Sequence, residues 1–95
     1  DNVDVLAEIK GRYSEDVLFS PIVSKPKEHK AFRYDDEARL LYMAEKGKQL
    51  LCIPNVKVEG RAVREIVISE AHTLLAHLGF RKTYDYLREF VWWKT

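Results

Sequence analysis

The sequence predicts an α+β fold in three parts: an N-terminal helical segment, a small three-stranded antiparallel sheet, and a helix-turn-helix pair. Hydrophobic residues recur with helical spacing in the first third of the chain, alternate with period two in the middle, and return to helical spacing afterwards. With 95 residues, 46% of them hydrophobic, the chain can fold without disulfides. We divide it into an N-terminal extension, residues 1–56, and a helical region, residues 57–95.

The N-terminal segment contains a helix start at Ser14, because a hydroxyl cap followed by acidic residues suits the positive end of a helix. After this cap, Val17, Leu18 and Ile22 are expected to face the core. Proline inside a helix costs roughly 3 kcal/mol. Pro21 therefore predicts a break, with a new turn that begins there.

A basic connector follows, with Lys25, Lys27 and Lys30 around His29. These side chains would suit a phosphate contact, but charged runs of this kind are more often solvated loops. We interpret the connector as a solvated loop and His29 as a surface residue.

Three strands joined by hairpins are predicted between Phe32 and Ile53, with Gly47 in the second turn. The acidic run at residues 35–37 lies at the first turn. Adjacent carboxylates can hold a divalent ion, but acidic residues at a hairpin are more often turn formers. We interpret this run as part of the turn.

Two helices joined by a turn are predicted in the C-terminal part. The first has an apolar stripe at core-facing helical spacing, formed by Val63, Ile66, Val67, Ala71, Leu74 and Leu75. The second is expected from about Arg81 to Trp92, with a long aromatic face formed by Phe80, Thr83, Tyr84, Leu87, Phe90 and Val91. Trp92 and Trp93 would close the core at its end.

Two of the three histidines lie at the joint between these helices. His72 lies nearly opposite the apolar stripe, and His77 would point well away from His72 if the helix continued. For the rings to meet, the helix must end between them, and Gly79 tolerates the backbone angles of such an ending. Two imidazoles at this spacing are half of a tetrahedral zinc site, but the only cysteine, Cys52, has no partner. The spacing alone leaves zinc ligands and ordinary surface histidines as alternatives.

Several motifs occur together in a recognisable order: Leu51-Cys52-Ile53-Pro54, Arg64-Glu65-Ile66, Ala71-His72, Ala76-His77-Leu78-Gly79, Lys82-Thr83, Tyr86-Leu87-Arg88 and Trp92-Trp93-Lys94. From about Phe32 to Thr95 the chain resembles the N-terminal region of integrases from Gypsy-class long-terminal-repeat retrotransposons, which are similar to gammaretroviral integrases. In that family a Cys-x-x-Cys beyond the double aromatic completes a His-His-Cys-Cys zinc domain. The resemblance therefore implies that His72 and His77 bind zinc in the full-length parent.

This chain stops before such cysteines and begins without methionine, which indicates a piece of a longer polypeptide. Residues 57–95 would then be the first part of the zinc-binding domain, and we expect no stoichiometric zinc in this fragment. The resemblance also implies a role in multimerising integrase and holding the element's DNA ends. Catalysis would belong to a separate downstream domain, and the parent would act inside the cell, first in a cytoplasmic particle and then in the nucleus.

The net charge of +1 is not that of a strongly basic, free-standing nucleic-acid binder. The chain after Gly47 is mildly basic, however, with 8 basic and 5 acidic residues. Any DNA contact is expected there and should weaken as salt rises. The predicted phosphate contacts are Arg61, Arg64, Arg81, Lys82 and Arg88.

The sequence contains no Gly-rich phosphate loop, no Gly-x-Ser-x-Gly elbow and no plausible Cys-His pair, so we expect no catalysis by this chain. No run of about 20 apolar residues is present, so we expect no membrane association. The alternative function is a protein-protein interaction module of a host protein derived from a retroelement, in which amphipathic helices and tryptophans contact a partner helix. Self-association into a dimer or larger oligomer through the last helix is also expected.

Overall fold

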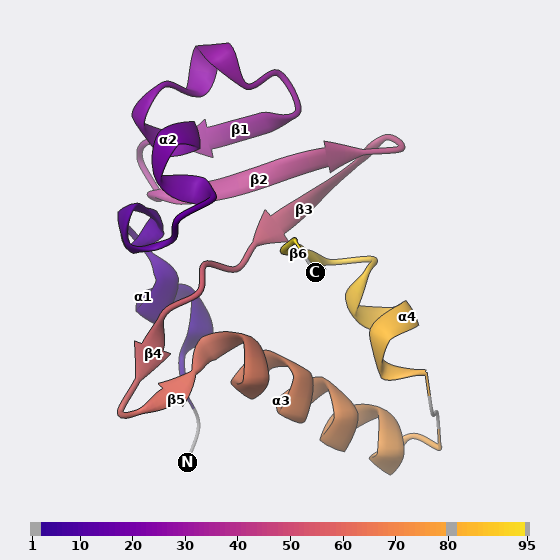
Figure 1. Ribbon diagram of the computed structural model, residues 1–95. Helices are drawn as coiled ribbons and strands as arrows, with labels where there is room; N and C mark the ends of the chain where they lie inside the picture. The colour runs from indigo at the N-terminus through magenta and orange to yellow at the C-terminus, as the bar shows by residue number, and fades with distance from the viewer. Residues whose placement is uncertain (1–2, 80–81, 95) are drawn as a thin grey trace.

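The computed structural model describes residues 3–79 and 82–94 and confirms the predicted α+β fold (Figure 1). The N-terminal part contains α1 (Val5–Ile9), a 3-10 turn (Tyr13–Glu15), α2 (Phe19–Ser24) and a second 3-10 turn (Pro26–Glu28). The middle part contains β1 (Phe32–Asp35), β2 (Leu40–Glu45) and β3 (Lys48–Cys52). The C-terminal part contains β4 (Lys57–Val58), β5 (Arg61–Ala62), α3 (Val63–His77), α4 (Thr83–Leu87) and β6 (Val91–Trp92).

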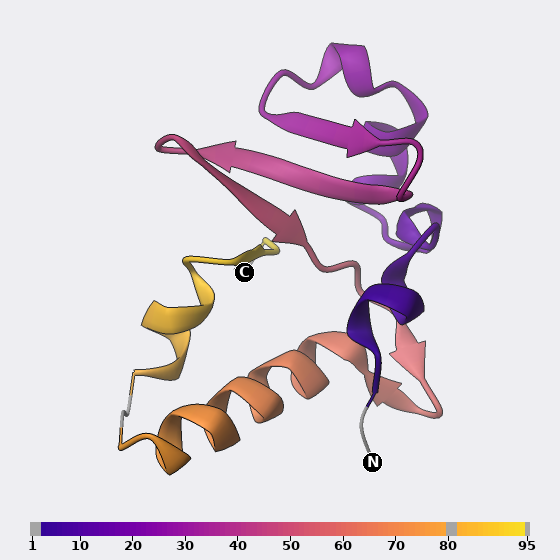
Figure 2. The same cartoon turned by 180° about the vertical axis from the view of Figure 1, so that it is seen from behind.

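The central sheet has the strand order β1-β2-β3-β6. Its first three strands are antiparallel, as predicted, whereas β6 runs parallel to β3 and was not predicted. Two backbone hydrogen bonds join β3 to the last segment: the Leu51 amide donates to the Phe90 carbonyl at 2.9 Å, and the Ile53 amide donates to the Trp92 carbonyl at 3.0 Å. Figure 2 shows this segment returning from α4 to the end of β3, so the C-terminal part of the chain contributes a strand to the extension's sheet.

Alternating side chains place two hydrophobic clusters on the two faces of this sheet. One cluster joins the extension's helical segment to the sheet and contains Tyr13, Phe19, Ile22, Leu41, Met43, Leu50 and Cys52. The other joins α1 and α3 to the sheet and contains Ile9, Leu40, Ile53, Val56 and Val63. Trp92 packs against the first cluster, and its neighbour Trp93 packs against the second, on the other face of the sheet.

The N-terminal cap differs from the prediction. Ser14 lies in a 3-10 turn, and Asp16 does the capping: its Oδ1 accepts hydrogen bonds from the amides of Leu18 at 2.8 Å and Phe19 at 3.0 Å. Ile22 is buried, as predicted, but Val17 is 95% exposed and Leu18 is 36% exposed. The prediction that Val17 and Leu18 face the core is wrong, because the cap places both residues in the turn before α2.

The predicted turn chemistry is confirmed at both hairpins of the extension. The Asp35 carboxylate accepts hydrogen bonds from the amides of Glu37 at 3.1 Å and Ala38 at 3.0 Å, so the acidic run forms the first turn. At the second turn Lys46 and Gly47 have positive φ angles of 50° and 79°, which a two-residue hairpin requires. A third hairpin, β4–β5, precedes α3.

The second helix of the predicted pair is much shorter than expected. Helix α4 ends at Leu87, and the chain then turns into β6 instead of continuing to Trp92. Aromatic and β-branched residues pack well on a sheet, and pairing with β3 satisfies their backbone groups. The aromatic pattern was therefore that of a short helix followed by a strand. Phe80 of this face and Arg81, where the helix was expected to begin, lie outside the described residues.

Candidate functional site

Helix α3 projects from the body of the protein, and α4 packs beside its second half (Figure 1). The first residue of α3 is anchored, since the Val63 amide donates to the Val56 carbonyl at 2.9 Å. The residues of the predicted stripe that are buried are Val63, Ile66, Ala71 and Leu75. Leu74 is 47% exposed, and Leu78, one turn further, is 58% exposed. The stripe therefore leaves the core near the end of α3.

The two histidines do not meet in this arrangement. Helix α3 continues through both residues and ends at His77, so the expectation that it ends between them is wrong. The turn after it has the Leu78 amide bonded to the Leu74 carbonyl at 3.1 Å and Gly79 at a φ of +85°. Five helical residues rotate the side chain by about 140° and raise it by about 7.5 Å. His72 and His77 thus leave α3 on different sides.

These positions do not fit a shared zinc ion, because each coordinating nitrogen must lie about 2.0–2.1 Å from the metal. The ring of His72 lies instead against α4, with its Nδ1 3.3 Å from Oγ1 of Thr83. Among residues 3–79 and 82–94, no three His, Cys, Asp or Glu side chains gather as a metal site. The assignment of His72 and His77 as zinc ligands stays a prediction.

The exposed cations among the predicted phosphate contacts lie on β5 and around α4. Arg61 is exposed on β5, beside the start of α3. Lys82 and Arg88 are exposed at the two ends of α4. Arg88 follows α4 where the chain returns to the sheet, and it lines a hollow with Leu50 and Trp92. Arg81 lies outside the described residues.

Arg64 has a different environment from the exposed cations. Its Nε donates to the carbonyl of Ile53 at 2.9 Å, and its Nη2 donates to Oδ2 of Asp16 at 3.1 Å. Its guanidinium carbon also lies 5.5 Å from the centre of the Trp93 ring. Burial lowers the pKa of Arg64, although the group stays charged at neutral pH. These contacts use the side chain inside the protein, and its predicted role in binding DNA stays a prediction.

Asp16 is the main residue that the sequence analysis missed. It is only 4% exposed, and its second oxygen accepts from the Asn55 amide at 2.7 Å as well as from Arg64. With its two bonds to the amides at the start of α2, this carboxylate joins α2, the segment after β3, and α3. The spacing of Asp16 before Phe19 is a capping signal in the sequence, but the contact with Arg64 across 48 positions has none.

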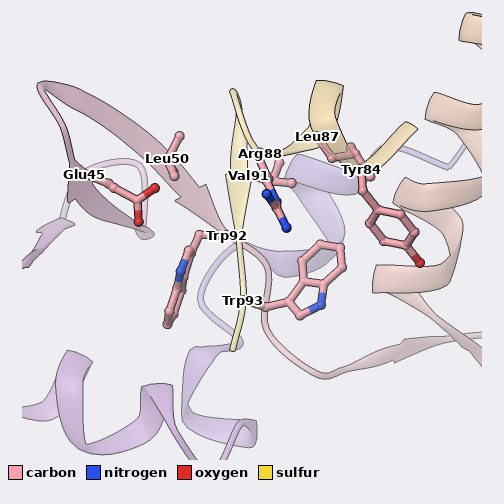
Figure 3. Close-up of a pocket in the computed structure, with 8 residues that line it drawn as sticks. All are labelled: Glu45, Leu50, Tyr84, Leu87, Arg88, Val91, Trp92 and Trp93. Atoms are coloured by element: carbon pink, nitrogen blue, oxygen red, sulfur yellow. The ribbon is translucent and has the colours of Figure 1, made fainter. Parts of the chain in front are cut away.

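A hollow of about 370 Å³ lies between α4 and the end of the sheet (Figure 3). Figure 3 shows Trp92 and Trp93 directed to opposite sides of β6, with Arg88 and Tyr84 on the side of α4. An ion pair between Lys48 and Glu89 connects β3 to the segment after α4. The hollow therefore presents one cation, Arg88, and one carboxylate, Glu45, beside aromatic surface.

Cys52 is a structural residue, because it is fully buried and burial raises the pKa of its thiol to about 12. Its carbonyl accepts a hydrogen bond from the buried hydroxyl of Tyr13 at 2.7 Å. Burial likewise raises the pKa of Tyr13 above its ordinary value. Neither group supplies an anion at neutral pH.

Residues 60–95 match the family model of the integrase zinc-binding domain. The matched segment begins at the turn before β5 and contains α3, α4, β6 and both histidines of the predicted pair. No curated protein and no solved structure matches the chain significantly. In the described part of the chain, none of the helices combines the length and apolar character needed to cross a bilayer.

Proposed function

We propose that the chain is the non-catalytic N-terminal region of a retroelement integrase, which helps integrase to multimerise and to hold the ends of the element's DNA. The observation that carries this proposal is the match of residues 60–95 to the integrase zinc-binding domain. The order of motifs from Leu51 to Lys94 further supports the Gypsy class, which is similar to gammaretroviral integrases. An integrase of this kind acts inside the cell, first in a cytoplasmic particle and then in the nucleus.

The proposed DNA contacts among the described residues are the exposed cations Arg61, Lys82 and Arg88. Arg61 lies on β5 at the start of α3, and Lys82 and Arg88 flank the two ends of α4. Exposed cations suit contacts with backbone phosphates, which position a protein on DNA without reading its sequence.

In the parent protein, zinc is the proposed cofactor, with His72 and His77 as ligands that downstream cysteines complete. In the arrangement described above, the two histidines do not share an ion.

DNA binding is tested by fluorescence anisotropy with a labelled duplex of mixed sequence, from about 50 to about 200 mM salt. We expect the affinity to fall as salt rises. In the triple variant Arg61→Gln, Lys82→Gln and Arg88→Gln, the slope of log affinity against log salt should become shallower by about 2 to 3. Lys10→Gln, an exposed cation after α1, is the matched control and should leave that slope unchanged. An affinity that depends neither on salt nor on the triple variant would exclude this surface as the DNA contact.

The alternative function, a protein-protein interaction module of a retroelement-derived host protein, is favoured by one observation. Apolar side chains are exposed along α3 and α4 and the turn that follows, with Leu74 47%, Leu78 58%, Tyr84 63% and Phe90 54% exposed. An apolar interface of this kind also suits self-association of the integrase region. Protein binding through this surface should depend little on salt, which separates it from DNA binding in the same titration.

A further inference from the structure

The two edge strands of the central sheet, β1 and β6, differ in how they are protected. Strand β1 carries the charged residues Arg33 and Asp35. Its Phe32 amide already donates to the His29 carbonyl at 3.0 Å. Charged side chains and local hydrogen bonds of this kind keep an edge strand from pairing with another chain. At the opposite edge, the segment at residues 91–93 carries no charged side chain, so β6 lacks the protection that β1 has.

The backbone of β6 pairs on one side only. The Ile53 amide donates to the Trp92 carbonyl at 3.0 Å, so the backbone groups of Trp92 face β3. Figure 3 shows Trp92 and Trp93 directed to opposite sides, as in an extended chain. Because successive residues of a strand direct their backbone groups to alternate edges, those of Val91 and Trp93 face away from β3. Within the described residues, no other backbone-backbone hydrogen bond engages the amide or carbonyl of Val91 or Trp93.

The hollow beside α4 lies at this open edge (Figure 3). Leu50 and Trp92 line it from the face of the sheet that packs on the first hydrophobic cluster. Val91 and Trp93 line it from the face that packs on the second cluster. A hollow bounded by residues of both faces is at the edge of the sheet, where a further strand would lie. Helix α4 supplies its other wall, through Tyr84, Leu87 and Arg88.

The chemistry of this edge identifies an extended peptide as its occupant. An extended peptide offers amides and carbonyls in alternation, which match the unpaired amides and carbonyls of Val91 and Trp93. A phosphate backbone offers acceptors alone, so nucleic acid would leave the two carbonyls without donors. The edge is also flanked by α4, which leaves room for a single segment more readily than for the sheet of a second folded copy.

We propose that the β6 edge binds an extended segment of a partner protein as a fifth strand of the central sheet. Hydrogen bonds with the backbone of Val91 and Trp93 supply affinity, and the hollow of about 370 Å³ receives an alternate side chain of the segment. The aromatic and aliphatic walls favour an apolar, β-branched side chain there. The hollow contains one cation, Arg88, and one carboxylate, Glu45, so the segment requires no net charge.

The test uses the 95-residue protein and a fluorescein-labelled peptide of alternating threonine and valine, because β-branched residues favour the extended conformation. Anisotropy measures affinity, and amide hydrogen exchange locates the bound peptide. Exchange of the Val91 and Trp93 amides should slow by about tenfold or more at saturation. The Phe32 amide, which is already bonded to His29, should exchange at an unchanged rate.

Two N-methylated peptides test whether the backbone pairs. Alternate amides of a strand face the same edge, so methyl groups on the valine amides and on the threonine amides block opposite edges. One of these peptides should bind about tenfold more weakly or worse, and the other within about twofold of the parent peptide. Equal weakening of both would overturn the proposal. It is also overturned if the parent peptide does not saturate the protein by about 1 mM.

Val91→Pro tests the same pairing from the protein side. Proline removes the amide proton that faces away from β3, and an edge strand tolerates proline where that proton faces outward. Binding should weaken about tenfold in Val91→Pro but less than about twofold in the matched control Val91→Thr, which keeps the amide. Unchanged binding in a folded Val91→Pro variant would overturn the proposal. Circular dichroism checks the fold, and if this variant unfolds, the methylated peptides decide.

Two other occupants give distinct results, and either would overturn the proposal. If the hollow binds nucleic acid, a single-stranded oligonucleotide will slow exchange of the Val91 and Trp93 amides and the peptide will not. If a second copy of the chain pairs with β6, sedimentation will show a dimer that Val91→Pro dissociates. Failure here leaves the proposed DNA contacts untouched, because Arg61, Lys82 and Arg88 are unchanged in these variants and are tested separately by the salt titration.

Discussion

Replacing Arg64 by alanine should destabilise the fold far more than its position on a basic helix suggests. The substitution removes the hydrogen bond to the Ile53 carbonyl, the ion pair with Asp16 and the contact with the Trp93 ring. These three contacts hold α3 against the extension and against the last strand. The Arg64 side chain is 21% exposed and that of Asp16 is 5% exposed, so solvent screens the pair only partly.

The expected loss follows from these contacts. A hydrogen bond to a charged group contributes about 1.5–3 kcal/mol, and a cation over an aromatic ring adds about 0.5–1 kcal/mol. Removing one partner of a fully buried ion pair costs about 3–5 kcal/mol. Asp16 keeps three backbone amide donors after the change, so its carboxylate does not become unpaired. We therefore expect Arg64→Ala to lower the free energy of unfolding by about 2–4 kcal/mol, below the sum of the separate contacts.

Urea unfolding followed by circular dichroism measures this change. Arg61→Ala is the matched control, because Arg61 is exposed three residues away, and a surface change of this kind should stay within about 0.5 kcal/mol. A double-mutant cycle with Asp16→Ala should give a coupling energy above about 0.5 kcal/mol. If Arg64→Ala unfolds at the same urea concentration as Arg61→Ala, the contacts described for Arg64 do not stabilise the fold, and the reasoning fails.

Three further predictions concern the last strand, the buried thiol and the metal. Trp92→Ala should destabilise the protein by about 3–5 kcal/mol in urea unfolding. The centre of the Trp92 ring lies 5.8 Å from that of Phe19 and 5.6 Å from that of Phe32. A loss below about 1 kcal/mol would refute this packing. The free energy of unfolding should fall as pH rises above 9.0, the ordinary pKa of the Cys52 thiol, by up to about 1.4 kcal/mol per pH unit until about pH 12. The reason is that the unfolded chain loses the thiol proton at a lower pH than the folded protein does. In Cys52→Ala, urea titrations across this pH range should lose that part of the slope, and an unchanged slope would argue against the raised pKa. Purified protein analysed by mass spectrometry for metals should contain no stoichiometric zinc; one zinc per chain that disappears in both His72→Ala and His77→Ala would contradict this expectation.

Local patterns predicted the elements whose stability is set by neighbouring residues. The alternation between Phe32 and Ile53 and the turn residue Gly47 predicted three antiparallel strands, and the structure confirms them. The acidic run at residues 35–37 was assigned correctly to a turn, because the Asp35 carboxylate bonds amides two and three positions later. Such interactions join residues only a few positions apart, so a short stretch of sequence is enough to predict them.

Long-range contacts decided the features that the sequence analysis missed. The aromatic face after Thr83 is compatible with a helix, and only the open edge of β3 makes Val91 and Trp92 a strand. Sequence patterns gave no indication that Asp16 and Arg64 are partners, because 48 positions separate them. Only the tertiary structure brings Lys94 to the turn before α2.

For the candidate site, the sequence by itself determined which residue types are present: the histidine pair, the cations around α3, and the motif order that resembles an integrase. The family match to residues 60–95 agrees with that order. The tertiary structure decided where these groups point. It separates His72 from His77 because the helix continues through both, and it holds Arg64 inside the protein while Arg61 stays exposed. Chemical identity is local to a residue, whereas direction and burial depend on which distant segments pack against it.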